Sequence, residues 1–153
     1  SSDLTALTIK LHGAVPSIQL YHPGKYTNLF SKNDPNPIGP MGFVRQDGVE
    51  VIAMDEELIE EMVEAYAAAA AHVMRAGFDC CQIHGGPGWL LSQFLSPLTN
   101  QRKDKYGGSL ENRMRMFVEV YCAIRKKVGE RFPIGLKLNW VRLFCDMLDN
   151  SLQ

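Results

Sequence analysis

The sequence predicts an α/β protein whose strands run parallel to one another. Short apolar segments with β-branched residues alternate with long segments of helical periodicity, and turn residues separate the two kinds. Strands that alternate with helices form a parallel sheet through right-handed crossovers. The chain has 153 residues, the size of one ordinary domain, and its 46% apolar and 22% charged residues are typical of a soluble globular protein.

The first third of the chain is predicted to contain a helix end, a strand and a long connection. Residues 3–12 form the helix end, and Gly13 stops it. Residues 14–20 form a short buried strand, which begins late because of Pro16. Residues 22–53 are rich in proline and glycine and predict an irregular binding loop or lid, the alternative being a disordered surface insertion.

The clearest helix covers residues 55–76. Acidic residues from Asp55 to Glu57 begin it, where the helix macrodipole favours negative charge, and an apolar stripe follows at 3.6-residue spacing. Gly77 ends it. The remaining predicted elements are a strand over 78–84, a loop over 85–106, a helix from the cap Ser109 to about Val128, and a strand over 133–139.

Charge and cysteine content exclude several classes of function. A formal charge of -1 gives no reason to expect nucleic acid or an anionic membrane as partner. No apolar run approaches the roughly 20 residues that span a bilayer, and no leader is present, so we expect a cytoplasmic protein. The cysteines at 80, 81, 122 and 145 lack metal-binding spacing, so we expect reduced thiols and no metal site.

Polar side chains mark the carboxyl ends of the three predicted strands, where parallel α/β folds bind their ligands. Gln19 carries an amide that suits the edge of a heterocycle. His84 can donate a hydrogen bond to a developing anion, and Lys137 brings a fixed positive charge. Glycines at 85, 86 and 88 would let the backbone approach a flat ligand.

Each of these residues also has a structural interpretation. His84 could be a hydrogen-bonded residue of the fold, and Gln19 could simply cap its strand. Lys137 could be exposed if its strand lies at a sheet edge, and Trp89 is of a type found more often in a core than against a cofactor. The residues alone therefore predict an α/β protein with a site near His84.

A longer motif extends this prediction. The run over residues 76–120 closely resembles the old yellow enzyme family of NADH:flavin oxidoreductases, and residues 17–28 and 132–139 look like neighbouring strands of that family. The matching segments are Ile83-His84, Gly88-Trp89-Leu90, Gln93-Phe94-Leu95-Ser96-Pro97, Asn100, Arg102, Asp104, Tyr106-Gly107-Gly108-Ser109 and Glu111-Asn112-Arg113. The resemblance covers about residues 1–140, and residues 141–153 form a divergent tail.

The resemblance implies a fold, a cofactor and roles for particular residues. The fold is part of a (β/α)8 TIM barrel, with about three parallel strands and their intervening helices; a whole barrel takes about 250 residues. FMN is the implied cofactor, NAD(P)H its reductant, and an activated alkene or related small molecule the substrate. Gln19 and Lys137 would bind the flavin, and His84 would bind the carbonyl oxygen of the substrate and stabilise the enolate.

Three positions depart from the family pattern around His84. Pro87 stands where a second side-chain donor to the substrate carbonyl is usual, and Trp89 stands at the site of the usual proton-donating tyrosine. The indole N–H of Trp89 can donate a hydrogen bond but is not a useful acid. Lys137 replaces the usual arginine and keeps its charge without its fork geometry. We therefore expect solvent or another group to supply the proton.

Two hypotheses for function remain, and a third is weak. The first is an FMN-dependent oxidoreductase seen as a barrel fragment, with His84 and Trp89 in its catalytic site. The second is a truncated, non-catalytic remnant that binds FMN weakly or not at all and self-associates through open sheet edges. A flavodoxin-like or Rossmann domain lacks the phosphate-binding glycine loop that it would need after a strand.

Overall fold

The computed structural model describes residues 2–27 and 36–138, and two small sheets organise them. The larger sheet is parallel, in the order β1 (Ser17–Leu20), β5 (Cys80–Gly85), β6 (Ile134–Leu138). Three parallel strands with intervening helices were predicted, and the sheet confirms them. The predicted tail 141–153 and the strand-end residue Asn139 lie outside the described residues.

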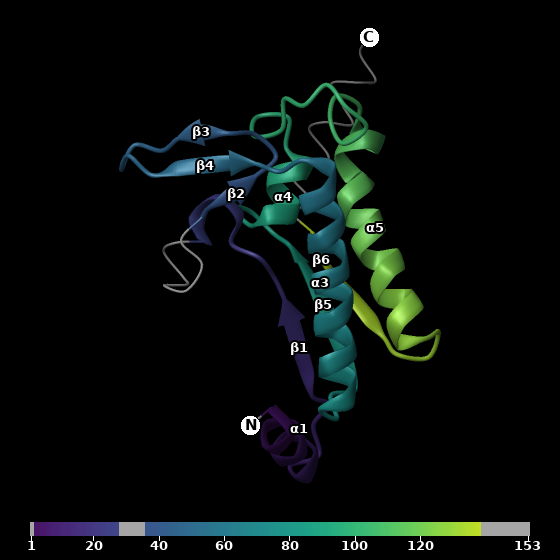
Figure 1. Cartoon of the computed structure of the whole chain (residues 1–153). Helices are drawn as coiled ribbons and strands as arrows, with labels where there is room; N and C mark the ends of the chain where they lie inside the picture. The colour runs from purple at the N-terminus through teal and green to yellow at the C-terminus, as the bar shows by residue number, and fades with distance from the viewer. Residues whose placement is uncertain (1, 28–35, 139–153) are drawn as a thin grey trace.

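Two long helices cover one face of the larger sheet. These are α3 (Glu56–Arg75) and α5 (Leu110–Val128), which lie side by side along the strands (Figure 1). Side-chain caps begin both: Asp55 accepts a hydrogen bond from the N–H of Leu58 at 2.8 Å, and Ser109 accepts one from Asn112 at 3.2 Å. Both helices therefore begin at the residues that the sequence predicts.

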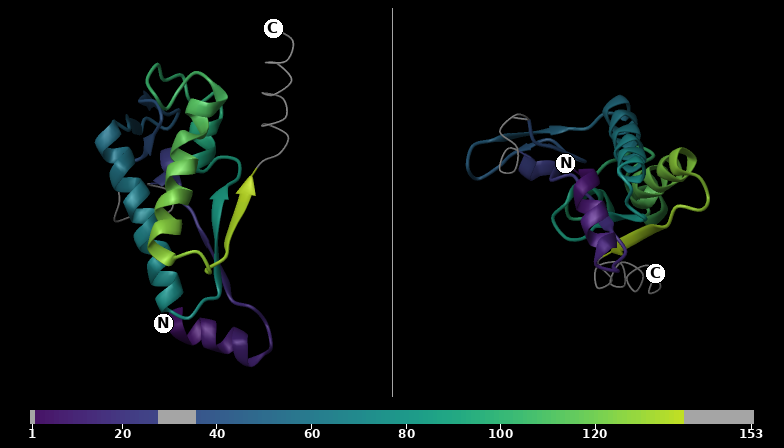
Figure 2. Two further views of the ribbon diagram at one scale, coloured as in Figure 1. Left: turned by 90° about the vertical axis from the view of Figure 1, so that its right-hand side faces the viewer. Right: turned by 90° about the horizontal axis from the view of Figure 1, so that it is seen from below.

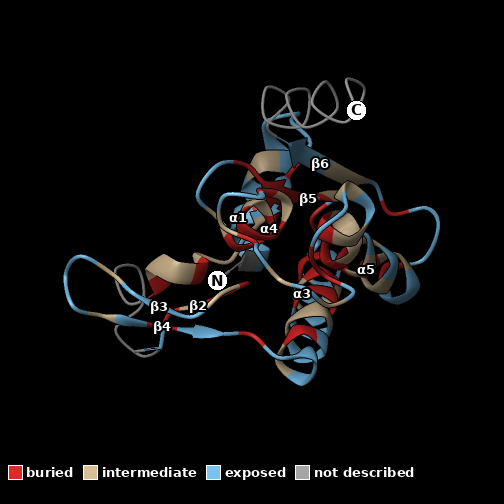
Figure 3. Ribbon diagram, turned by 90° about the horizontal axis from the view of Figure 1, so that it is seen from above, coloured by how far each residue is buried: buried red, intermediate tan, exposed pale blue. Residues whose placement is uncertain are grey.

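The core lies between these helices and the sheet. Figure 3 shows the buried residues gathered there, and the left view of Figure 2 shows α3 and α5 on the same side of the strands. Cys81 and Ile83 of β5 point into this core and are at most 1% exposed. Because side chains alternate along a strand, Gln82 and His84 point to the opposite face of the sheet, which none of the described helices covers.

A helix at one end of the sheet and short elements at the other complete the larger unit. Helix α1 (Ser2–Leu11) lies near the amino ends of the strands, as Figure 1 shows, and the Nζ atom of Lys10 lies 2.6 Å from the Asp79 carboxylate. Near the carboxyl ends lie the 3-10 helix η1 (Gly24–Tyr26) and α4 (Leu90–Leu95). The carboxyl ends of the strands thus lie beside the loops formed by the family motif over residues 76–120.

A second sheet corrects the prediction of an irregular connection over residues 22–53. Strands β2 (Ile38–Gly39), β4 (Glu50–Ala53) and β3 (Phe43–Val44) pair in that order, and β3 and β4 form a hairpin that projects from the molecule (Figure 1). Residues 28–35 of the connection lie outside the described residues. These strands are two to four residues long, too short for an alternating pattern to be recognised.

Helix α4 corrects the prediction of an uninterrupted loop over residues 85–106. Its residues are mostly buried: Leu90, Leu91 and Phe94 are at most 1% exposed, and the polar Gln93 is buried as well. A helix of six residues makes fewer than two turns, so it is too short to show the 3.6-residue periodicity that identified α3 and α5.

Candidate functional site at the strand ends

Three of the four predicted site residues share the uncovered face of the parallel sheet. Gln19 pairs in register with Gln82 of the neighbouring strand, and His84 pairs in register with Lys137. The side chains of these four residues therefore form two rows near the carboxyl ends of β1, β5 and β6. Trp89, the fourth predicted residue, precedes α4 and follows the turn after β5.

His84 is held as a neutral hydrogen-bond donor. Its side chain is buried, and its Nδ1 atom accepts a hydrogen bond from the backbone N–H of Gly86 at 3.1 Å. In a neutral imidazole the other nitrogen, Nε2, then carries the proton. Burial lowers the pKa of His84, and the charge of Lys137 lowers it further, so both effects favour this neutral form.

Gly86 allows the imidazole to occupy this position. A Cβ atom at residue 86 would lie 2.4 Å from the Cε1 atom of His84, closer than two carbon atoms can approach without a shift. The glycine-rich turn after β5 therefore serves the placement of His84. Pro87 and Gly88 at the tip of this turn are exposed.

We expect Lys137→Met to raise the pKa of His84 without restoring it to the ordinary value, because burial is the larger cause of the shift. A depressed histidine pKa means that the unfolded chain binds the proton more readily, so stability falls as pH drops below the ordinary pKa near 6.5. NMR titration of the imidazole measures the change in the pKa of His84, with Lys126→Met as control. An unchanged pKa would show that water screens Lys137 from His84.

The indole of Trp89 lies against His84 and also meets Tyr21. The ring of Trp89 lies 5.7 Å from that of His84 and 5.1 Å from that of Tyr21, which it meets edge to face. Trp89 is half-buried, whereas Tyr21 is 50% exposed. Tyr21 follows Gln19 by two residues at the end of β1. The predicted site residues do not include Tyr21, because its proximity to Trp89 depends on the pairing of two distant strands.

Gln93 connects the loops that carry these residues. Its buried amide donates to the carbonyl oxygen of Gly88 at 2.7 Å and to that of Pro23 at 3.2 Å, and it accepts from the N–H of Lys25 at 3.3 Å. The N–H of Leu90 also donates to a carbonyl oxygen in the loop after β1, at 2.9 Å. The loops after β1 and β5 are therefore joined by several hydrogen bonds, and α4 lies between them.

The rest of the motif builds a structural loop beside the site. Asn100 is buried and donates to the carbonyl oxygens of Phe94 and Tyr106, both at 2.7 Å. The guanidinium of Arg113 is buried and donates to the carbonyl oxygen of Leu95 at 2.8 Å. Arg102 bonds the Asp104 carboxylate and lowers the pKa of that group. These polar side chains satisfy backbone groups of the loop, which explains why the motif needs them.

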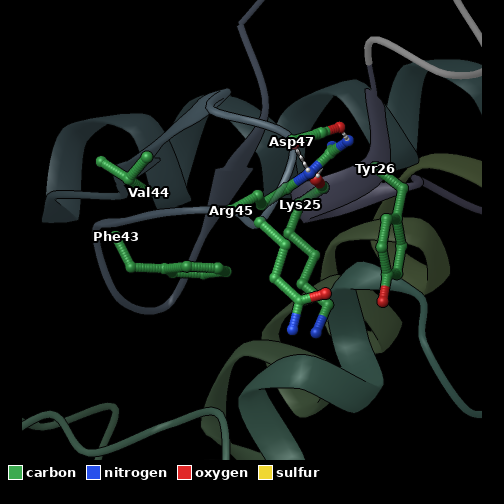
Figure 4. Close-up of a pocket in the computed structure, with 7 residues that line it drawn as sticks. Lys25, Tyr26, Phe43, Val44, Arg45 and Asp47 are labelled. Carbon is green, nitrogen blue, oxygen red and sulfur yellow. Dashed lines mark hydrogen bonds and ion pairs between the residues drawn. The ribbon is translucent and has the colours of Figure 1, made fainter.

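A separate hollow of about 600 Å³ lies beneath the β3–β4 hairpin, lined by Lys25, Tyr26, Phe43, Val44, Arg45, Gln46 and Asp47 (Figure 4). The Arg45 guanidinium turns toward Asp47 and also donates to the carbonyl oxygen of Lys25 at 2.7 Å. Arg45 thus attaches the hairpin to η1. The hollow shares no residue with the rows of polar side chains on the parallel sheet.

The described fold is that of a parallel α/β protein, and the predicted site residues lie near the carboxyl ends of its strands. The family model described as "NADH:flavin oxidoreductase / NADH oxidase family" matches residues 4–151, so the chain belongs to this family. The resemblance to old yellow enzymes is therefore confirmed. Within residues 2–27 and 36–138, no helix is both long and apolar enough to cross a membrane.

Individual relatives agree with this assignment. An "NADPH dehydrogenase" of Halalkalibacterium halodurans is 43% identical over 79% of this chain, and the match covers 35% of that protein. A "NADH-dependent flavin oxidoreductase" of Aspergillus parasiticus is 37% identical over 89% of this chain and is covered to 32%. The chain thus spans about a third of the length of these curated relatives.

Two solved structures are similar to this chain in three dimensions. Morphinone reductase in complex with tetrahydroNAD superposes with a TM-score of 0.77 at 28% identity, covering 89% of this chain and 42% of that one. The 2-naphthoyl-CoA reductase complex gives a TM-score of 0.80 at 31% identity, covering 88% of this chain and 22% of that chain. The three parallel strands are therefore part of a TIM-barrel arrangement, as the sequence predicts.

Proposed function

We propose that this chain carries part of the site of an FMN-dependent oxidoreductase, which takes reducing equivalents from NAD(P)H and reduces an activated alkene or a related small molecule. The observation that carries the proposal is the row of polar side chains on the uncovered face of the sheet. Polar groups gathered at the carboxyl ends of parallel strands are typical of a ligand site in this class of fold.

The residues on this face fit the pyrimidine edge of a flavin. Gln19 is exposed and can both donate to a ring carbonyl and accept from a ring N–H. Lys137 is also exposed, and its ammonium group suits a site of negative charge on the ring. When bound, FMN would supply the hydride chemistry, and the protein would bind and orient the reactants.

His84 would bind the substrate. Its Nε2–H group can donate to a carbonyl oxygen conjugated with the alkene, and this hydrogen bond strengthens as negative charge develops on that oxygen. A neutral imidazole is suited to this role, because it stabilises the charged substrate oxygen by a hydrogen bond without transferring a proton to it. One such donor typically contributes a few kcal/mol to transition-state stabilisation.

Trp89 would form a wall of the same site. Its ring contacts those of Tyr21 and His84, where it can pack against a flat substrate and exclude water. Since an indole is not a useful acid, the proton that completes the reduction would come from solvent or from another group. The three described cysteines are free thiols, which fits the cytoplasmic location that we propose.

The alternative is a chain that holds FMN weakly or not at all and associates with other copies. It is favoured by the strand order, in which β1 and β6 are the outer strands of the described sheet. Outer strands offer unpaired backbone groups on which another chain can add a strand. Self-association of this kind would also cover the apolar side chains of Leu136 and Leu138, which are 47% and 40% exposed.

Titration with FMN tests the proposal against this alternative. We expect the purified chain to quench FMN fluorescence saturably, and Gln19→Ala to weaken that binding more than it weakens binding of a phenolic ligand. Bound FMN should then be reduced by NADH or NADPH under anaerobic conditions. Absence of quenching, together with concentration-dependent association in sedimentation experiments, would support the non-catalytic alternative.

A further inference from the structure

A pair of amide side chains lies across the first two strands of the parallel sheet. Gln19 on β1 and Gln82 on β5 are partners in the strand register and point to the same uncovered face. The Nε2 atom of Gln19 donates a hydrogen bond to the Oε1 atom of Gln82. Within the described part of the chain, this is the one side-chain hydrogen bond of either residue.

The strand on the other side of Gln82 offers its amide no side-chain partner. Its partner in register on the other side is Gly135 of β6, which has no side chain to bond with it. A Cβ atom there would lie 3.5 Å from the Cγ atom of Gln82, in ordinary van der Waals contact. Gln82 is half-buried, whereas Gln19 is exposed to solvent and free to meet a ligand.

We propose that Gln82 is a positioning residue that fixes the orientation of the Gln19 amide for an imide ligand. With Nε2 of Gln19 engaged by Gln82, its Oε1 atom is turned away from the pair and left as an acceptor. An imide edge, such as that of the flavin pyrimidine, presents an N–H donor between two carbonyl acceptors. The Oε1 atom would accept from this N–H, and the second hydrogen on Nε2 could serve a flanking carbonyl.

The energetic advantage follows from the near symmetry of a glutamine amide. Free rotation about its last bond exchanges the donor and the acceptor at little cost. A rotated Gln19 would present N–H to N–H and repel the imide, so an acceptor that holds Nε2 removes the wrong orientation before binding. This inference rests on the proposed function, because the imide that it invokes is that of FMN.

The test compares FMN with an FMN analogue methylated at the imide nitrogen, which lacks that N–H. We expect the wild-type chain to prefer FMN. Gln82→Met should lower FMN affinity about twofold, because only one of the two amide orientations of Gln19 then fits the imide, and it should reduce the preference. In a Gln19→Ala background, Gln82→Met should have no further effect. Gln82→Glu keeps the acceptor and should retain the preference for FMN.

Two results would overturn the inference. One is an equal loss of FMN affinity on Gln82→Met with and without Gln19, which would show that Gln82 does not act through it. The other concerns the flavin-free chain. There the side-chain amide signals of Gln19 in NMR spectra should shift in Gln82→Met and keep their wild-type positions in Gln82→Glu. If the signals do not move in Gln82→Met, the two amides are not paired. Failure of the wild-type chain to bind FMN would instead refute the proposed function, and the NMR result would still decide the pairing.

Discussion

Gly107→Ala is expected to destabilise the chain by about 3 kcal/mol, through a clash that the loop cannot relieve. A Cβ atom at this position would lie 2.2 Å from the carbonyl oxygen of Arg102 and 2.5 Å from its carbonyl carbon. Both are backbone atoms of a loop that Asn100 and Asp104 hold through hydrogen bonds, so the obstacle is not the free end of a flexible side chain. Urea unfolding measures the loss as a lower midpoint at an unchanged slope.

The adjacent Gly108 provides a matched control. It has a φ of 80° and no atom within 4 Å of a built Cβ, so Gly108→Ala meets open space and only backbone strain. We expect that change to cost about 1 kcal/mol. Equal losses from the two substitutions would mean that backbone strain, and not the contact with Arg102, explains the glycine at 107.

Gly107 belongs to the part of the family motif that builds the loop before α5. Several of the matched residues hydrogen-bond backbone groups of one loop, namely Asn100, Asp104, Asn112 and Arg113. Their similarity to the family therefore supports the fold. Evidence for the chemistry has to come from the strand ends, where Pro87, Trp89 and Lys137 depart from the usual pattern.

The long elements could be predicted because their signals are local. Asp55 and Ser109 cap the two long helices, and glycines at 77 and 129 end them with positive φ angles, so each boundary is marked by a nearby residue. The β3–β4 hairpin was missed, although Asp47-Gly48 is a recognised hairpin turn and Gly48 has a φ of 81°. The prolines and glycines that precede that turn suggested an irregular loop instead.

The site could be predicted only in part, because register is not a local property. The sequence indicates that Gln19, His84 and Lys137 end strands, but not which of them lie side by side. The pairing of Gln19 with Gln82, and of Tyr21 with Trp89, follows from the alignment of β1 with β5, two strands separated by about sixty residues of chain. Similarly, the tautomer of His84 depends on the turn that brings the N–H of Gly86 to its Nδ1 atom.

His84→Ala is expected to weaken binding of a phenolate ligand at least tenfold while changing FMN affinity less than twofold. The imidazole offers Nε2–H to an anionic oxygen, and a hydrogen bond to a charged group contributes about 1.5–3 kcal/mol. The long-wavelength absorbance that appears when a phenolate stacks on bound FMN measures the first affinity, and quenching of FMN fluorescence measures the second. The control is His12→Ala, since His12 is exposed and follows α1.

The pH dependence of the same titration separates the two roles that His84 could have. Because burial and Lys137 lower its pKa, the imidazole is neutral at pH 7, and its donor is present throughout the neutral range. Phenolate affinity should therefore follow ionisation of the phenol alone as the pH rises from 7. If His84→Ala reduced both affinities equally, the residue would be a structural part of the turn, and the hydrogen bond from Gly86 would be its whole function.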